Sequence, residues 1–224
     1  MVGGLPDVAT IQRRWSELTE RVTAAGADLD TLTIVAVTKA FPAELVRRAV
    51  DAGLEDIGEN YAQELLAKRS ELAAAGGTRV RWHFIGGLQR NKVKLLAGAV
   101  HLWQTVDRDS VIDEIAKRSP GDAVLIQVNT TGEAQKAGCD PSDTAARVER
   151  ARGRGLDVRG LMTIGPTSQD EDPRPAFARL RRLAASCEVD ELSMGMSADY
   201  ELAIAEGATM IRVGSVLFGP RPPR

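Results

Sequence analysis

Short apolar, β-branched runs alternate with longer amphipathic segments along almost the whole chain. Runs such as Thr33–Val37 are typical of buried strands, whereas apolar residues at helical spacing indicate helices. This pattern predicts strands at 33–38, 56–58, 81–86, 101–105, 123–128, 158–164, 191–194 and 210–213. It predicts helices at 7–25, 42–52, 60–75, 88–97, 110–118, 141–152, 173–185 and 198–206. Asp7 is the expected N-cap of the first helix.

The order of these elements predicts the fold class. Strands that alternate with helices form a parallel sheet, and eight such units favour an α/β fold with a single closed (β/α)8 TIM barrel. An open doubly wound sheet is the alternative, because periodicity does not show closure. A dinucleotide-binding fold is disfavoured, since no G-x-G-x-x-G follows the first strand. No linker or low-complexity tract interrupts the pattern, so we expect one domain over residues 1–224.

Composition excludes several classes of function. The chain has 29 Lys and Arg against 31 Asp and Glu, and this net charge of −2 does not favour nucleic acid as a partner. No stretch approaches the ~18 apolar residues of a membrane helix and no secretory leader is visible, so a cytoplasmic protein is expected. Two cysteines and two histidines without ligand spacing predict neither a disulfide framework nor a metal site.

The expected barrel directs attention to the carboxyl ends of its strands, where active sites of this fold lie. The first strand ends on Lys39. One interpretation is a solvated lysine at a strand end. The other is an amine at the mouth of a pocket, where partial burial makes it a nucleophile toward carbonyl groups.

Two Gly/Ser segments follow the last two expected strands. SMGMS (193–197) places Ser197 before a helix expected from Ala198, and VGSVLFG (213–219) places Gly214 and Ser215 after the eighth strand. N-capping and simple turn formation explain each segment alone. Together they favour a phosphate site, because the loops after strands seven and eight commonly hold phosphate in barrels.

Arg212 lies inside the last apolar strand, where an arginine needs an acceptor because it keeps its charge. It could face outward or pair with a carboxylate such as Glu59 or Asp199. It could also donate to the ring nitrogen of a bound heterocycle, as in pyridoxal phosphate sites. Together with the lysine and the phosphate segments, this arginine predicts a ligand that is a phosphorylated pyridine with an aldehyde group.

Six segments resemble, in order, the pyridoxal phosphate homeostasis protein family. They are VAVTKAFP (35–42), GENYAQE (58–64), WHFIGGLQRNK (82–92), QVNTTGEAQKAG (127–138), GLMTIGP (160–166) and SMGMSADYELAIAEGATMIRVGSVLFG (193–219). The combination of the last segment with WHFIG-x-LQ-x-NK is specific. The resemblance implies a barrel like the N-terminal domain of alanine racemase, with pyridoxal 5′-phosphate as cofactor.

The resemblance also implies roles for individual residues. Lys39 matches the lysine that forms a Schiff base with the cofactor. Arg212 matches the arginine near the pyridine nitrogen. Three positions match the phosphate-binding residues, namely Ser197, Gly214 and Ser215, the last of which is often threonine in the family. Three more match residues that line the cofactor pocket: Asn60, His83 and Met194.

Three functions are compatible with such a site. The family resemblance implies a monomeric carrier that keeps free pyridoxal phosphate low and supplies it to apoenzymes, with no substantial catalysis. An amino-acid racemase is the main alternative, but it needs a second base opposite the lysine. In alanine racemase a C-terminal domain of the partner subunit supplies that tyrosine, and we expect this chain to lack such a domain. A lysine-dependent aldolase would need neither Arg212 nor the cofactor.

Overall fold

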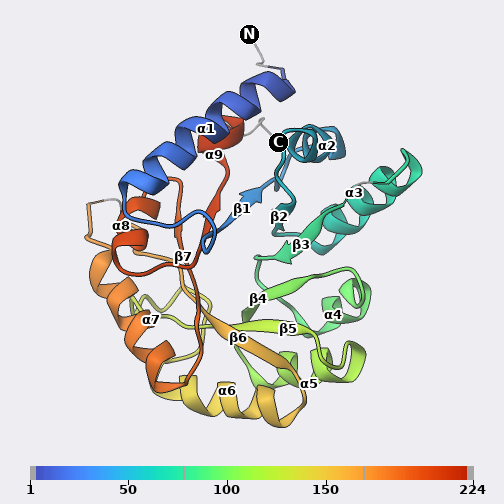
Figure 1. Cartoon of the computed structure of the whole chain (residues 1–224). Helices are drawn as coiled ribbons and strands as arrows, with labels where there is room; N and C mark the ends of the chain where they lie inside the picture. Colours follow the sequence, from blue (N-terminus) through green and yellow to red (C-terminus); the bar gives the residue numbers. More distant parts are fainter. Residues whose placement is uncertain (1–3, 78, 169, 221–224) are drawn as a thin grey trace.

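A closed barrel of eight parallel strands, ordered β1 to β8, forms the centre of the computed structural model (Figure 1). The structure describes residues 4–77, 79–168 and 170–220. The strands are β1 (Thr33–Val37), β2 (Asp56–Glu59), β3 (Arg81–Phe84), β4 (Leu102–Val106), β5 (Ala123–Gln127), β6 (Asp157–Met162), β7 (Glu191–Met196) and β8 (Met210–Val213). The expected barrel is confirmed, and the open-sheet alternative is wrong because β1 pairs with β8. The single-domain assignment for residues 1–224 stays a prediction.

Helices surround the barrel and cover its outer face (Figure 1). They are α1 (Val8–Ala24), α2 (Ala43–Asp51), α3 (Ala62–Ala74), α4 (Arg90–Leu96), α5 (Asp109–Arg118), α6 (Thr144–Gly153), α7 (Arg174–Ser186), α8 (Tyr200–Ala205) and α9 (Ser215–Phe218), with a 3₁₀ turn at Pro141–Asp143. Asp7 caps α1 as expected, since its side chain accepts from the Thr10 amide at 2.8 Å. Each predicted helix is present, with differences of a few residues at the ends.

Successive side chains of a strand point alternately out of and into the barrel, and they form two apolar clusters. Side chains such as Ile34 and Met194 point outward and pack in the large cluster that includes the helices. The smaller cluster fills the barrel interior with Val35, Leu102, Ala123, Leu125, Met162 and Met210. This alternation decides which side chain at each strand end can reach the cavity at the carboxyl end.

Candidate functional site

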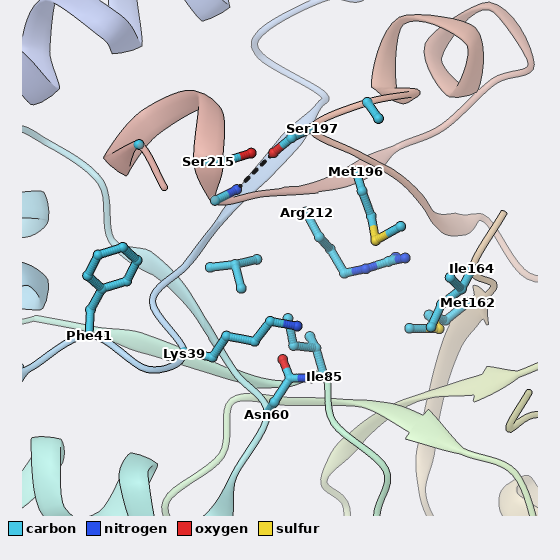
Figure 2. Close-up of a pocket in the computed structure, with 14 residues that line it drawn as sticks. Lys39, Phe41, Asn60, Ile85, Met162, Ile164, Met196, Ser197, Arg212 and Ser215 are labelled. Carbon is cyan, nitrogen blue, oxygen red and sulfur yellow. Dashed lines mark hydrogen bonds between the residues drawn. The ribbon is translucent and has the colours of Figure 1, made fainter. Parts of the chain in front are cut away.

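A cavity of about 260 Å³ opens at the carboxyl ends of the strands (Figure 2). This volume is near the lower end of the range of ligand pockets, about 300–1,000 Å³. Its polar side chains are Lys39, Asn60, Ser197, Arg212 and Ser215. Its apolar side chains are Val37, Phe41, Ile85, Met162, Ile164, Met196 and Ala198. An apolar wall with a few convergent polar groups is typical of a small-molecule site.

Lys39 is presented by a tight turn directly after β1. The Phe41 amide donates to the Thr38 carbonyl at 3.1 Å, so Lys39 and Ala40 are the two central residues of the turn. Ala40 has φ of 66°, a left-handed conformation that costs an alanine roughly 1 kcal/mol or more. Figure 2 shows that the turn directs the Lys39 side chain into the cavity. Lys39 is half-buried, so its side chain is only partly exposed to solvent.

Charged residues of β2 and α3 support this turn, and two of them, Glu59 and Lys68, are buried. Lys68 Nζ donates to the Thr38 carbonyl at 2.8 Å and to Glu59 Oε1 at 2.5 Å. Glu64 Oε2 accepts from the Ala40 amide at 3.0 Å. Burial raises the pKa of Glu59, and Lys68 only partly offsets this effect. We call Glu59, Glu64 and Lys68 the turn clamp.

Sequence reasoning missed the turn clamp. Lys68 lies in an amphipathic helix, where a lysine is usually solvated, yet its side chain is only 5% exposed. A sequence signal exists in retrospect. Lys68 follows Leu65 at a helical spacing that places both on the buried face of α3.

Arg212 is buried, and among the described residues it donates hydrogen bonds to neutral groups alone. Its Nη1 donates to Ser193 Oγ at 2.6 Å and its Nη2 donates to the Thr163 carbonyl at 2.8 Å. Burial lowers the pKa of Arg212 to about 10, which leaves it charged at neutral pH. A guanidinium has five N–H donors, so donors remain for a ligand in the cavity.

The ion-pair and outward-facing interpretations of Arg212 are therefore wrong. Within the part of the chain that the structure describes, no carboxylate lies within ion-pair distance of its guanidinium. Glu59 pairs with Lys68, and Asp199 Oδ1 accepts from the Met196 amide at 2.6 Å. The guanidinium lines the cavity instead.

The two Gly/Ser segments meet on one wall of the cavity, as the sequence predicts (Figure 2). The Gly214 amide donates to Ser197 Oγ at 3.2 Å, and Ser215 begins α9 beside them. A Cβ on Gly214 would lie 3.1 Å from the Val37 carbonyl, so glycine allows the close approach of β8 to β1. The predicted N-cap role of Ser197 is wrong, because α8 begins at Tyr200.

Asn60 brings an acceptor to the cavity. Its Oδ1 is buried and has no hydrogen-bond partner among the described residues. A buried acceptor without a partner costs about 1–3 kcal/mol, so this atom fits a ligand that donates a hydrogen bond. Gly86 fixes the backbone here, since a Cβ on it would lie 2.0 Å from the Asn60 carbonyl oxygen.

Two residues that were expected to line the pocket do not lie in its lining. Met194 points outward into the helix-facing cluster, and Met196, two positions later, lines the cavity. His83 lies inside the barrel, where its ring contacts Asp56 and Gln104. Ile85 takes its place in the lining, because the next inward position of that chain segment is closer to the carboxyl end. The sequence pattern identified the segments but not the layer of each side chain.

The described residues offer no cluster of three or more His, Cys, Asp or Glu side chains suited to a metal ion. Cys139 is buried, and burial raises the pKa of its thiol to about 11. Cys187 is buried as well. Across residues 4–77, 79–168 and 170–220, none of the helices combines the length and apolar character that crossing a membrane requires.

Comparison with known proteins identifies the family of this chain. The family model for the alanine racemase N-terminal domain matches residues 7–222. The pyridoxal phosphate homeostasis protein of Pseudomonas aeruginosa is 43% identical over 214 residues, which are 92% of each chain. The chain belongs to the pyridoxal phosphate homeostasis protein family. The human member is 39% identical over 209 residues, covering 84% of this chain and 76% of the human protein.

Solved structures of relatives share the barrel. PipY of Synechococcus elongatus without PLP superposes with a TM-score of 0.83 at 33% identity, covering 93% of this chain and 100% of PipY. PipY with PLP bound superposes with a TM-score of 0.79 at 32% identity, with the same coverage. Alanine racemase of Corynebacterium glutamicum has a TM-score of 0.69 at 16% identity over 96% of this chain and 62% of the racemase. This last match shows the fold alone.

Proposed function

We propose that this protein binds pyridoxal 5′-phosphate in the cavity and takes part in the intracellular homeostasis of that cofactor. One observation carries the proposal. A lysine amine, an arginine whose hydrogen-bond partners among the described residues are neutral, and a Gly/Ser wall line the same cavity, although they come from opposite ends of the chain. Membership in the pyridoxal phosphate homeostasis protein family supports the same conclusion.

The residues present fit this cofactor. Ser197, Ser215 and the Gly214 segment would hold the phosphate, and Arg212 would donate to the pyridine nitrogen. The orphaned Asn60 Oδ1 would accept from the ring hydroxyl. When bound, the cofactor supplies an aldehyde that condenses with a primary amine and releases one water. Lys39 is the amine that lines the cavity.

The small number of possible proton-transfer groups in the cavity favours binding of the cofactor over catalysis. Among the described residues that line the cavity, Lys39 is the one side chain suited to act as a base at neutral pH. Tyr61 is 44% exposed, whereas Tyr200 is buried and donates to Glu201. A donor from Arg212 also keeps the ring nitrogen unprotonated, which weakens the ring as an electron sink. These features support a homeostasis protein rather than an amino-acid racemase.

We further propose that the bound cofactor is supplied to pyridoxal phosphate-dependent apoenzymes. Met196 lines the cavity and is 39% exposed, so the cavity is open to solvent on this side. This opening supports release of the bound cofactor. A cytoplasmic location and a monomeric state stay predictions. Size-exclusion chromatography with light scattering tests the monomer directly.

The proposal is tested by incubating the protein with pyridoxal 5′-phosphate, reducing it with borohydride and mapping the peptides by mass. We expect a yellow protein before reduction and the added mass on Lys39. Lys39→Ala should lose the covalent link and keep some non-covalent binding, while Lys94→Ala, at an exposed position of α4, should behave as wild type. A colourless protein would overturn the proposal. Conversion of L-alanine to D-alanine would favour the racemase.

A further inference from the structure

A continuous chain of hydrogen bonds crosses the barrel interior from the cavity to the opposite end of the barrel. Arg212 Nη1 contacts Ser193 Oγ at 2.6 Å, and Ser193 Oγ contacts Gln104 Oε1 at 2.7 Å. Gln104 Nε2 lies 2.9 Å from His83 Nδ1, and His83 Nε2 lies 2.9 Å from Asp56 Oδ1. Asp56 is the first residue of β2, so the chain ends at the amino-terminal side of the sheet. We call these five residues the interior relay.

The interior relay is polar where barrels usually contain branched apolar side chains. All of its members except Asp56 are buried, with Gln104 and Ser193 fully so. Buried polar groups are costly unless each finds a partner, and here each link is made. They come from β3, β4, β7 and β8, so the barrel itself fixes their relative positions.

The chemistry of Arg212 sets the direction of every hydrogen bond. Arginine only donates, so Ser193 Oγ accepts from it and uses its single proton to donate to Gln104 Oε1. The Gln104 amide nitrogen then faces His83 and donates to its Nδ1. An accepting Nδ1 carries no proton, so the proton of the ring is on Nε2 and is donated to Asp56.

We propose that Ser193 and Gln104 are positioning residues for Arg212, and that the interior relay holds His83 as the neutral Nε2–H tautomer. This inference rests on the proposed function, because the ligand of Arg212 is taken to be the pyridine nitrogen.

The relay explains how a buried guanidinium keeps its position without an adjacent carboxylate. The carboxylate of the relay, Asp56, lies at its far end, and Asp199 acts on Arg212 only from beyond hydrogen-bond distance. A carboxylate in direct contact would compete with the ligand for the N–H donors. Neutral partners fix the guanidinium and leave donors for an acceptor, which selects a heterocycle whose ring nitrogen is unprotonated.

The first test uses ¹⁵N NMR to determine which ring nitrogens of His83 carry a proton in the cofactor-free protein at pH 7. His83 and His101 are the two histidines of the sequence, and His101→Gln assigns the signals. We expect His83 to carry one proton, on Nε2. In Gln104→Glu, which exchanges the donor for a second acceptor, we expect both ring nitrogens to be protonated. A wild-type His83 with a proton on Nδ1 would overturn the inference.

The second test reads Arg212 through ligand binding. We expect Ser193→Ala to weaken the binding of pyridoxine 5′-phosphate, which has the ring but no aldehyde, by about tenfold, the loss expected for one hydrogen bond of a charged group. We also expect it to change the absorbance that reports protonation of the bound ring. Ser119→Ala, at a buried serine outside the relay, should alter neither.

The outcomes separate the two proposals. If the wild type binds neither phosphorylated ligand, the proposed function fails, and the NMR result still decides the tautomer. If the wild type binds and folded Ser193→Ala keeps wild-type affinity and absorbance, the positioning role fails and the proposed function stands. Circular dichroism of each variant confirms folding.

Discussion

Lys68 Nζ lies 2.5 Å from Glu59 Oε1 in a region of the barrel that is almost fully enclosed. The same ammonium also binds the carbonyl of Thr38, the residue before Lys39. The ion pair therefore connects the outer helix α3 to the turn that presents the candidate cofactor lysine. Removal of one partner of a buried pair leaves an uncompensated charge, which is more costly than loss of the pair as a whole.

Lys68→Met should lower the free energy of unfolding by about 3–5 kcal/mol, the usual cost of breaking a buried ion pair. Urea denaturation measures the change. The double variant Glu59→Leu with Lys68→Met should recover most of the loss, because no buried charge remains. Lys94→Met, at an exposed position, should stay within about 0.5 kcal/mol of wild type. Equal losses in the single and double variants would contradict the role of the charge.

Gly86→Ala should abolish high-affinity binding of pyridoxal 5′-phosphate. Its Cβ would lie 2.0 Å from the Asn60 carbonyl oxygen, so the backbone of Asn60, which positions a cavity side chain, must shift. Gly87→Ala is the matched control, since no atom of the described residues other than its chain neighbours lies within 4 Å of its added Cβ. Isothermal titration of both variants checks the expectation, and similar affinities for the two would refute it.

Ser197→Ala should reduce the preference for the phosphorylated cofactor over pyridoxal. The hydroxyl accepts from the Gly214 amide and holds the two Gly/Ser segments together. We expect the affinity for pyridoxal 5′-phosphate to fall about tenfold. Binding of pyridoxal, which lacks the phosphate, should change little. A parallel loss for both ligands would place the phosphate elsewhere in the cavity.

Asp56 should make the protein sensitive to acid. Burial opposes ionisation of its carboxyl, but hydrogen bonds from Arg81 and His83 outweigh burial and hold the pKa below its ordinary value of 3.8. A carboxyl pKa that is lowered in the folded state stabilises the protein at pH values above the unfolded pKa. This contribution is lost as the pH falls from the unfolded pKa toward the folded pKa. The stability difference between wild type and Asp56→Asn should therefore narrow from pH 6 to pH 3. Asp157→Asn, at an exposed residue, is the control.

The strands and their order were predictable from sequence because short apolar segments, such as Thr33–Val37 and Ala123–Gln127, alternate with helical patterns, and a parallel barrel buries both faces of its strands. The layer of the barrel in which each side chain lies was less predictable. Met194 and Met196 are chemically identical and two positions apart, and a bulge between β7 and β8 shifts their register. The interior relay was invisible for the same reason, since Gln104 and Ser193 look like ordinary polar residues until the barrel closes around them.

The cavity lies where the first and last strands meet, and this fact has a consequence for the order of folding. Thr33–Ala36 of β1 pair with Met210–Val213 of β8, so Lys39 and Arg212 come together through a contact between distant parts of the chain. Such non-local pairings form late and slowly. A partly folded chain would contain the lysine turn but no opposite wall. The ligand would therefore bind only after β1 has paired with β8. Because it binds the closed barrel and not the partly folded chain, it would stabilise this pairing by mass action.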